Sequence, residues 1–435
     1  MTASTVARPP RTFRLLARVA RAVGARSTEA LVFSAATLVA LLHALDDAFL
    51  LPGPGVPLGQ HALAAAIAVV LSVAAMLAFP RLRPGLRAAI AFAFGALATV
   101  NGGRHAHHIL TESATANDVT GALALAAGLV LLGLAAAIPF RHRGEGDAGP
   151  VRRWATRGLV LAAGVLSVSV FFGPVGMAMT DIHSLEKPLG DPPNAAYETV
   201  HFTASDGVEL EGWYRPSRNG ASVLLLSGGG SNRMGPLRHA KMLERQGYGV
   251  LVYDPRGSGH SEGTVNSYGW GWEKDAAAAL DFLAGRDDVE PGRVGALGLS
   301  TGADIAIDIA ARRDDVKAVV ADGSAAIGYE DIKEYSSKTL DRAPMCVLFK
   351  TIEVIQGREQ PQESLADQIA RSTAPHLLIS ANKAEKEWGE LYDRRGGDRS
   401  ELWYLPKAGH TAALKQYPDA YERRVAAFFG EHLGR

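Results

Sequence analysis

The hydrophobic and polar positions of this chain follow two different patterns, which change over at about residue 180. Before that point, long apolar stretches alternate with short charged clusters, and each stretch is close to the ~20 residues that a membrane-spanning helix needs. The first stretch is too long for the apolar core of a signal peptide and has no small-residue cleavage site after it, so we expect it to be retained. The pattern predicts an all-α transmembrane bundle over residues 30–180, with five spans, of which the third is the least uniformly apolar: 30–51, 61–79, 86–103, 119–139 and 158–180.

Basic residues give this predicted bundle an orientation. Arginine clusters lie in the segment 1–29, between the second and third spans, and between the fourth and fifth, whereas the other connections are nearly free of Arg and Lys. Because positively charged segments stay in the cytoplasm, five spans place the N-terminus inside and the chain after residue 180 outside. If the third stretch does not span, four spans place the C-terminal half in the cytoplasm. The charge pattern favours five spans, in a multi-pass protein of the cell membrane.

Ionisable side chains gather near the predicted outer face of the bundle. Imidazole and carboxylate groups together can ligate Zn²⁺ or a related metal, and ionisable groups in membrane segments are often functional. Polar side chains in the interfacial zone are also commonly solvated and paired with one another. We favour this second interpretation and predict neither a metal nor a cofactor. The residues concerned are His43, Asp46, Asp47, His105, His107, His108, Glu112 and Asp118.

Shorter apolar runs follow the linker at residues 181–196, whose Pro-Pro and Gly mark a boundary. A hairpin is predicted around Asp206-Gly207, a favoured turn pair. After it, apolar runs of strand length alternate with segments of helical pattern such as GPLRHAKMLERQ and WEKDAAAALDFLAGR. This alternation predicts an α/β domain over residues 197–435, with a mostly parallel sheet covered by helices on both faces. Functional residues are then expected at the carboxyl ends of the strands. The predicted core strands are SVLLLSG, GVLVYD, VGALGLS, VKAVVAD, HLLISA and ELWYLP.

The motif Gly-x-Ser-x-Gly, which surrounds the nucleophile of many hydrolases, occurs twice, centred on Ser261 and on Ser300. A nucleophile elbow needs a strand that runs into the serine and a helix that leaves it. Ser300 has the apolar run VGALGL before it and the amphipathic segment ADIAIDIAARR after it, whereas Ser261 lies between two loop segments. We therefore predict Ser300 as the nucleophile, with Gly298 and Gly302 as the elbow glycines, and a structural role for Ser261.

A general base is expected on the loop after the last predicted strand, where it can take the proton of the serine. His410 lies there, in the segment PKAGHT. The acid that orients such a histidine is expected after the strand HLLISA, where the sequence offers Glu385 and Glu387 but no Asp. Glu385 is preferred for its distance from the strand. Glu387 is the alternative, and Asp322, directly after the preceding strand, is a third candidate.

Two backbone N–H groups are predicted to stabilise the oxyanion that forms during acyl transfer. One belongs to Thr301, the residue after the nucleophile. The other comes from the loop SGGG (227–230), which follows the first long buried strand, with Gly229 as the expected donor. Glycines at this point allow the backbone to approach the reacting atoms closely.

These residues resemble the α/β-hydrolase superfamily over about residues 197–435, in the order Ser, acid, His. Asp206-Gly207 with Gly212-Trp213, the glycine loop and the segment DPRGSGHS (254–261) look like its serine aminopeptidase/dienelactone-hydrolase-like branch. The resemblance implies an α/β-hydrolase fold and cleavage of a carboxylic ester, thioester or amide through an acyl-enzyme. The sequence departs from the family pattern in two places, because Ser227-Gly228 replaces the usual His-Gly and the acid is Glu where Asp is commoner.

The composition of the chain limits which partners this predicted enzyme can bind. Lys and Arg together number 45, as do Asp and Glu, so the net charge is zero and no basic field favours nucleic acid. The single cysteine, Cys346, excludes an intramolecular disulfide. We therefore expect a serine hydrolase anchored in the lipid bilayer that acts on a small or lipid-like acyl substrate, with an ester favoured. The alternatives are an acyltransferase that uses the same three residues, and a membrane sensor or transport-associated protein with a non-catalytic hydrolase-like domain.

Overall fold

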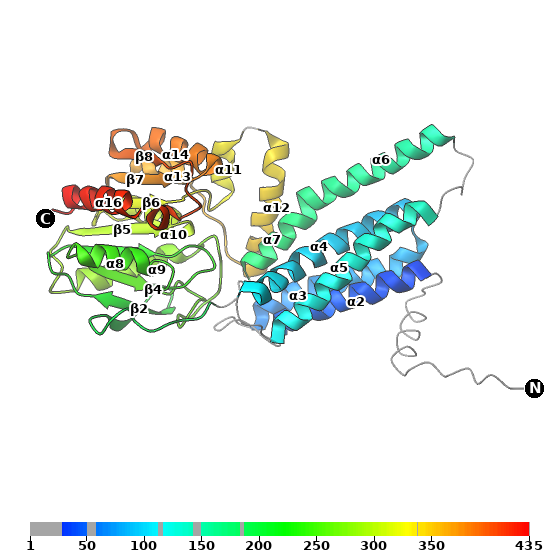
Figure 1. The fold of residues 1–435 in the computed structure, drawn as a ribbon, viewed down its shortest axis with the longest axis horizontal. Helices are drawn as coiled ribbons and strands as arrows, with labels where there is room; N and C mark the ends of the chain where they lie inside the picture. The colour runs from blue at the N-terminus through cyan, green and yellow to red at the C-terminus, as the bar shows by residue number, and fades with distance from the viewer. Residues whose placement is uncertain are drawn as a thin grey trace, which may run out of the picture. The chain divides into compact units, whose positions relative to one another are not determined.

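The computed structural model describes residues 28–49, 58–111, 116–141, 149–182, 187–336 and 338–434. The chain divides into two compact units, one of helices that extends to Met177 and one from Ala178 to the C-terminus. In Figure 1 the first unit runs from blue through cyan to blue-green, and the second runs from green to red.

The helical unit is held together by close packing of small and aromatic residues. The rings of Phe33 and Phe79 stack with their centroids 4.1 Å apart, and both side chains are fully buried. Gly95 and Gly128 lie where helices α4 and α5 cross, and a Cβ on either glycine would come within 3.0 Å of the opposite helix. Such small residues let helix backbones approach closely. The helices are α2 (Thr28–Phe49), α3 (Leu58–Ala78), α4 (Pro84–Thr111), α5 (Ala116–Arg141), α6 (Pro150–Ser167), a π-helical segment (Val168–Phe172) and α7 (Gly173–Asp181).

Each of the five predicted spans coincides with helix in the described residues. Among the residues that the structure describes, three helical segments are long and apolar enough to cross a membrane, namely Thr28–Asp46, Pro84–Gly103 and Val119–Arg141. The second of these contains the stretch at 86–103 that the sequence makes the least uniformly apolar. In the other two predicted spans, the described apolar helical segments are shorter, Ala65–Arg81 and Gly164–Ala178. The helices are compatible with a membrane region, and the number of spans stays a prediction.

The second unit is built on an eight-stranded sheet with the strand order β1-β2-β4-β3-β5-β6-β7-β8. The first two strands form the predicted hairpin and β2 pairs antiparallel with β4, whereas all later pairs are parallel. The central strands β3, β4, β5 and β7 are buried along their whole length, as expected for strands covered on both faces. The strands are β1 (Glu198–Thr203), β2 (Glu209–Arg215), β3 (Ser222–Leu226), β4 (Gly249–Tyr253), β5 (Val294–Leu299), β6 (Val316–Asp322), β7 (His376–Ser380) and β8 (Ser400–Tyr404).

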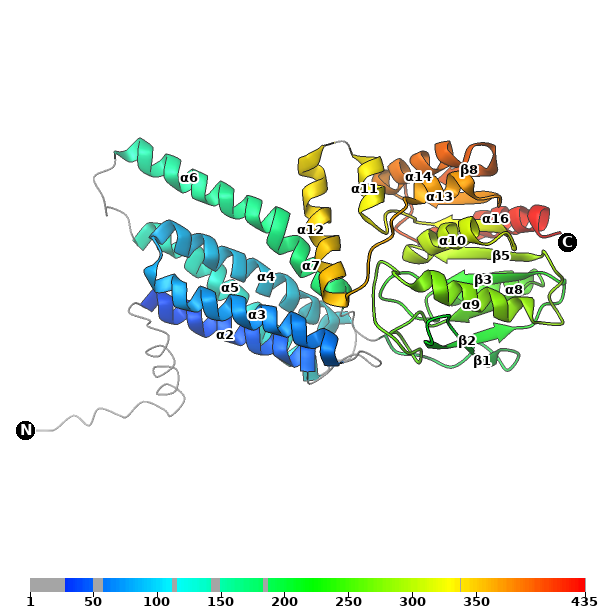
Figure 2. The same ribbon diagram turned by 180° about the vertical axis from the view of Figure 1, so that it is seen from behind.

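Helices cover both faces of this sheet. Helices α8 and α16 share one hydrophobic core with the strands, and α9 and α10 lie against the opposite face, as the two views of Figures 1 and 2 show. The predicted mostly parallel sheet with helices on both faces is therefore confirmed. The helices are α8 (Leu237–Arg245), α9 (Trp272–Ala284), α10 (Thr301–Arg312), α11 (Tyr329–Tyr335), α12 (Thr339–Gln356), α13 (Leu365–Arg371), α14 (Lys383–Gly396), α15 (Ala413–Gln416) and α16 (Pro418–His432).

Candidate active site

Ser300 occupies a strained turn between the end of β5 and the start of α10. Its backbone has φ 54° and ψ −123°, a conformation that side-chain-bearing residues rarely adopt. The turn is tight enough to need both flanking glycines, because a Cβ on Gly298 would lie 2.0 Å from the carbonyl oxygen of Gly302. A Cβ on Gly302 would in turn lie 2.4 Å from the carbonyl oxygen of Leu226 in β3. This geometry is that of a nucleophile elbow, which lifts the serine hydroxyl above the carboxyl end of the sheet.

A chain of hydrogen bonds joins Ser300 to His410 and Glu385. The His410 Nε2 atom lies 2.9 Å from Ser300 Oγ, and its Nδ1 atom lies 3.0 Å from Glu385 Oε1. His410 comes from the loop after β8 and is half exposed, whereas Glu385 comes from the first turn of α14 and is buried. These distances are within hydrogen-bonding range for a nucleophile, a base and an orienting acid.

Local contacts hold the Glu385 carboxylate in place. Its Oε2 atom accepts the backbone N–H of Ala381 at 2.8 Å, and Asn382 donates its side-chain amide to Oε1. Burial by itself would raise the pKa of Glu385, but the hydrogen bonds from His410 and Ala381 outweigh it and leave the pKa below the ordinary value. The hydrogen bond to Glu385 also raises the pKa of His410, against the opposing effect of burial. The pair therefore favours a charged carboxylate next to an imidazole that readily holds a proton.

The glycine loop after β3 packs directly against the elbow. A Cβ on Gly228 would lie 3.2 Å from the Cβ of Ser300, and one on Gly229 would lie 2.2 Å from the carbonyl oxygen of Ser267. Thr301 Oγ1 donates to that same carbonyl at 2.7 Å. The N–H of Thr301 belongs to the first turn of α10, where backbone donors have no intrahelical acceptor. A Cβ on Gly229 would also lie 2.9 Å from Thr301 Oγ1, so the two predicted donor residues are close neighbours beside the elbow.

Comparison with known proteins places the second unit in a family. The family model for X-Pro dipeptidyl-peptidase (S15 family) matches residues 196–428, more than half of the chain. The chain belongs to this family. The resemblance to the α/β-hydrolase superfamily is confirmed by this match.

Individual relatives cover only parts of this S15-family chain. YfhR of Escherichia coli (strain K12) is 32% identical over 149 residues, which are 32% of this chain and 51% of YfhR. The α/β-hydrolase domain-containing protein WAV2 of Arabidopsis thaliana is 34% identical over 113 residues, which are 25% of this chain and 36% of WAV2. The Pyrococcus furiosus esterase Pf2001 aligns with 22% identity and a TM-score of 0.46, covering 57% of this chain and 97% of the esterase. The chain therefore spans about half the length of YfhR and about a third of WAV2.

The other two candidate acids of this S15-family protein have different partners. Glu387 accepts a hydrogen bond from the hydroxyl of Tyr335. Asp322 accepts one from the hydroxyl of Tyr421 at 3.1 Å, with both side chains buried. Burial, together with the charge of Glu385, raises the pKa of Asp322 to about 7. Among the three carboxylates, Glu385 is the one whose oxygen is hydrogen-bonded to His410.

The serine of the second Gly-x-Ser-x-Gly match joins its own loop to β2 and to the residue after β4. Ser261 Oγ donates to the carbonyl of Asp254 at 2.6 Å and accepts the backbone N–H of Glu211 at 3.0 Å. Its side chain is buried, and both contacts are to backbone. These contacts are of the kind that a structural role requires.

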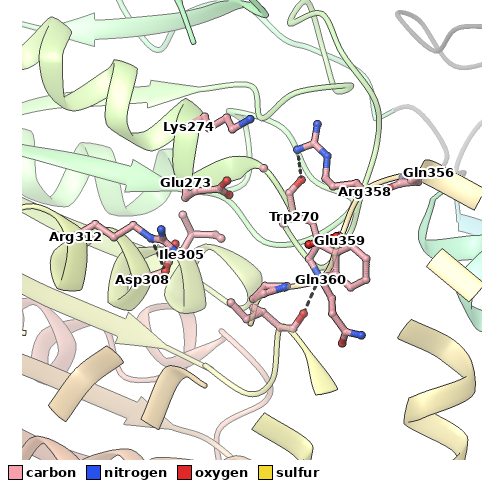
Figure 3. Close-up of a pocket in the computed structure, with 15 residues that line it drawn as sticks. Trp270, Glu273, Lys274, Ile305, Asp308, Arg312, Gln356, Arg358, Glu359 and Gln360 are labelled. Atoms are coloured by element: carbon pink, nitrogen blue, oxygen red, sulfur yellow. Dashed lines mark hydrogen bonds and ion pairs between the residues drawn. The ribbon is translucent and has the colours of Figure 1, made fainter. Parts of the chain in front are cut away.

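A cavity of about 410 Å³ lies beside α9 and α10. Figure 3 shows its lining, to which Trp270, Ile305, Asp308 and Gln360 contribute. Burial raises the pKa of Asp308 to about 6, although Arg312 donates to it at 2.8 Å. The described lining contains none of the three hydrogen-bonded residues Ser300, Glu385 and His410.

The ionisable residues of the helical unit form a small paired cluster. His43 Nδ1 lies 3.0 Å from Thr120 Oγ1, which donates to Asp46 at 2.6 Å, and the rings of His43 and His105 meet edge to face at 4.7 Å. Within the part of the chain that the structure describes, no three His, Cys, Asp or Glu side chains are arranged to hold a metal ion. The side chains of five other candidates lie outside the described residues: Asp47, His107, His108, Glu112 and Asp118.

Proposed function

We propose that this protein cleaves a carboxylic ester through an acyl-enzyme, with Ser300 as nucleophile, His410 as base and Glu385 as the orienting acid. The observation that carries the proposal is the continuous hydrogen-bonded chain from Ser300 Oγ through the His410 ring to the Glu385 carboxylate. His410 takes the proton of Ser300 as the hydroxyl attacks the substrate carbonyl, and then gives that proton to the leaving group. Glu385 fixes the tautomer of His410 and stabilises the imidazolium that forms. His410 then takes a proton from water as the water attacks the acyl-enzyme, and it gives that proton to Ser300 Oγ as the acyl–oxygen bond breaks and the acid leaves.

Backbone donors complete this proposed mechanism. In this mechanism the N–H groups of Gly229 and Thr301 stabilise the negative charge that develops on the substrate oxygen. Preorganised donors of this kind stabilise the transition state more than the ground state, because the oxyanion forms only in the transition state and the intermediate. The absence of a side chain at Gly229 is what lets the loop lie against Thr301 and Ser267.

A peptide bond is a second candidate for the scissile group. The matching family model describes X-Pro dipeptidyl-peptidases, which supports an amide with a proline-containing acyl part. The same three residues can cleave either bond, since both pass through a tetrahedral intermediate and an acyl-enzyme. An acyltransferase differs only in replacing water by another acceptor.

Product analysis separates these activities. We expect purified protein to release the free acid from small and medium-chain carboxylic esters, faster than it releases amine from dipeptidyl amides with proline at the second position. Addition of an alcohol or amine acceptor should leave the free acid as the main product. Faster cleavage of the proline amides would replace the ester proposal by a peptidase, and acyl transfer as the main reaction would replace it by an acyltransferase.

We further propose that the helical unit anchors the enzyme in the membrane with the hydrolase unit outside. The three long apolar helices and the basic clusters at alternate connections support this arrangement. A reporter fused after about residue 190 should then give an extracytoplasmic signal, whereas one fused in the basic connection at about residue 145 should give a cytoplasmic signal. A cytoplasmic signal at residue 190 would contradict the five-span model and favour four spans.

A further inference from the structure

We propose that the buried ion pair of Arg233 and Asp254 positions the glycine loop, and with it the Gly229 N–H, for oxyanion stabilisation. Both are positioning residues, because they act through the loop rather than on the substrate. The inference rests on the proposed function of Ser300 and the loop, and it gives a role to two residues to which the sequence analysis assigned none.

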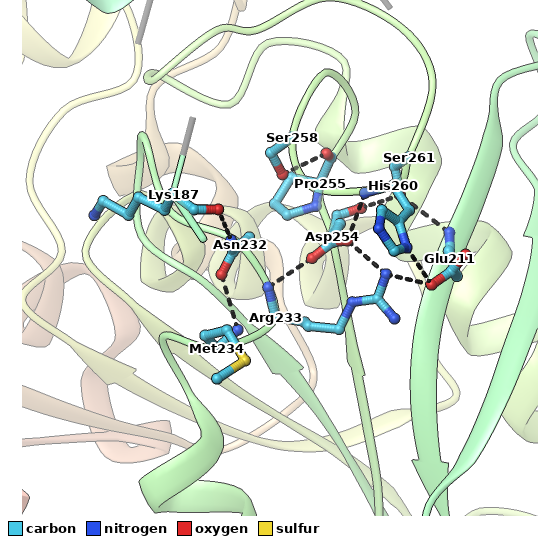
Figure 4. A network of polar contacts seen from close by, with 10 residues as sticks. All are labelled: Lys187, Glu211, Asn232, Arg233, Met234, Asp254, Pro255, Ser258, His260 and Ser261. Carbon is cyan, nitrogen blue, oxygen red and sulfur yellow. Dashed lines mark hydrogen bonds and ion pairs between the residues drawn. The ribbon is translucent and has the colours of Figure 1, made fainter. Parts of the chain in front are cut away.

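Asp254 is the point at which three segments of the chain meet. It directly follows β4, and its two carboxylate oxygens accept hydrogen bonds from both other segments (Figure 4). Oδ1 accepts the backbone N–H of Arg233 at 2.8 Å, and Oδ2 accepts Arg233 Nη2 at 2.6 Å. Oδ2 also accepts the backbone N–H of His260 at 2.9 Å. The carboxylate therefore fixes both the backbone and the side chain of Arg233.

The ion pair is buried and is shared with a second carboxylate. The side chains of Arg233 and Asp254 are 1% and 0% exposed, and Arg233 Nη2 also donates to Glu211 at 2.7 Å. Arg233 Nε has no hydrogen-bond partner among the described residues, so the guanidinium is not fully satisfied. A buried ion pair contributes little net stability once the cost of removing both charges from water is counted. The pair is therefore better explained by a need to hold this part of the chain in one position than by a contribution to the free energy of unfolding.

In this proposal the ion pair fixes the position of the glycine loop. Three consecutive glycines have more conformational freedom than any other tripeptide, so a loop that contains them needs an external anchor. Arg233 is three residues beyond Gly230, which itself has φ 63°. Short turns link the two, since Ser231 N–H donates to the Gly228 carbonyl at 3.1 Å and Gly235 N–H donates to Asn232 at 3.0 Å. The anchor is thus the first strong charged contact after the glycines.

Displacement of this anchor should weaken the oxyanion site while leaving Ser300 and His410 in place. Removal of one oxyanion donor typically costs 10²–10³ in kcat. Because the ion pair acts through the loop, we expect a loss of about 10- to 100-fold in kcat, with KM nearly unchanged, for Asp254→Asn. Asparagine keeps the shape of the side chain but cannot accept the same set of hydrogen bonds from Arg233.

The test compares oxygen esters with the matching thionoesters in the full-length protein. Sulfur is a poor hydrogen-bond acceptor, so a thionoester gains little from an oxyanion site, and the ratio of kcat/KM for the two substrates measures that site. Partial unfolding lowers both rates equally and leaves the ratio unchanged. We expect the ratio to fall toward one in Asp254→Asn and in Arg233→Lys, which keeps the charge but loses the forked geometry. The second variant carries the test if the first does not fold.

Asp275→Asn is the matched control. Asp275 forms an equally buried ion pair with Arg256, at 2.5 Å and with side-chain exposures of 0% and 1%, but it lies on α9 and not on the glycine loop. We expect this variant to keep the wild-type ratio. An unchanged ratio in both loop-anchor variants, or an equal fall in Asp275→Asn, would overturn the inference while the wild-type activity stands. Failure of the wild type to show Ser300-dependent hydrolysis would overturn the proposed function and the inference together.

Discussion

Replacement of Ser300 by alanine is expected to lower ester hydrolysis by on the order of 10⁴- to 10⁶-fold and to abolish labelling by a fluorophosphonate probe. The reason is that the alanine variant has no group that can form the acyl-enzyme, so His410 and the oxyanion donors retain only their small residual effect on the attack of water. The strained backbone at Ser300 accepts the methyl side chain as it accepts the hydroxymethyl group, and the fold should persist. Mass spectrometry of the labelled protein, with a kinetic assay in parallel, measures both effects.

Ser261→Ala provides the matched control, since Ser261 is the other serine in a Gly-x-Ser-x-Gly sequence. Its hydroxyl bonds only to backbone groups, so this variant should still be labelled at Ser300. Continued labelling of the Ser300→Ala protein would refute the assignment of the nucleophile. A wild-type protein that resists the probe altogether would instead favour a membrane sensor with a non-catalytic hydrolase domain.

Glu385→Gln is expected to lower kcat by about 10³- to 10⁴-fold, the scale seen when the orienting acid of such a triad becomes an amide. Glutamine keeps the shape of the side chain, but it cannot stabilise the imidazolium of His410 and can present an N–H to Nδ1. Glu387→Gln serves as the control, because Glu387 is paired with Tyr335 on another side of α14. Activity of Glu387→Gln should stay within a few-fold of the wild type. A larger loss in Glu387→Gln than in Glu385→Gln would reverse the assignment of the acid.

The wild type and Glu385→Gln should differ in the pH dependence of kcat/KM. His410 must be neutral to accept the serine proton, and its hydrogen bond to Glu385 raises the pKa of the imidazole above 6.5. Wild-type activity is therefore expected to rise with pH through a value above 6.5. Loss of the carboxylate charge in Glu385→Gln removes the main cause of the raised pKa, so the acidic limb should move to lower pH. An acidic limb that stays in place in this variant would contradict the ion pairing of His410 with Glu385.

The order of strands and helices could be predicted because it depends on local patterns. The apolar run before Ser300 and the amphipathic segment after it correspond to β5 and α10, and the loop that carries His410 follows β8 as expected. The sequence favoured Glu385 over Glu387 only by its distance from the preceding strand. Two residues that are two positions apart on a helix point to different sides of it. The side chain of Asn382 caps the N-terminus of α14, and the residue at which the helix begins determines which side each later residue faces. With the helix beginning at Lys383, it is Glu385 that faces His410.

The contact between Arg233 and Asp254 could not be predicted from local sequence patterns either. Asp254 was visible in the sequence as the start of DPRGSGHS, and the glycine loop was visible as a candidate oxyanion site. Nothing in either segment indicates that the charge at Arg233 is buried against Asp254. That contact arises because β3 and β4 are neighbours in the sheet, which brings the loops at their carboxyl ends together.

The sequence by itself determined the two-part organisation of this protein, the nucleophile elbow and the residue types of the site, because each depends on the periodicity and chemistry of a few neighbouring residues. Only the tertiary structure shows that Glu385 is the carboxylate hydrogen-bonded to His410 and that Arg233 is paired with Asp254. Ser300 and His410 are 110 residues apart in the chain and 2.9 Å apart at the site. They meet because β5, β6, β7 and β8 are parallel neighbours, so the loops after them converge at one edge of the sheet.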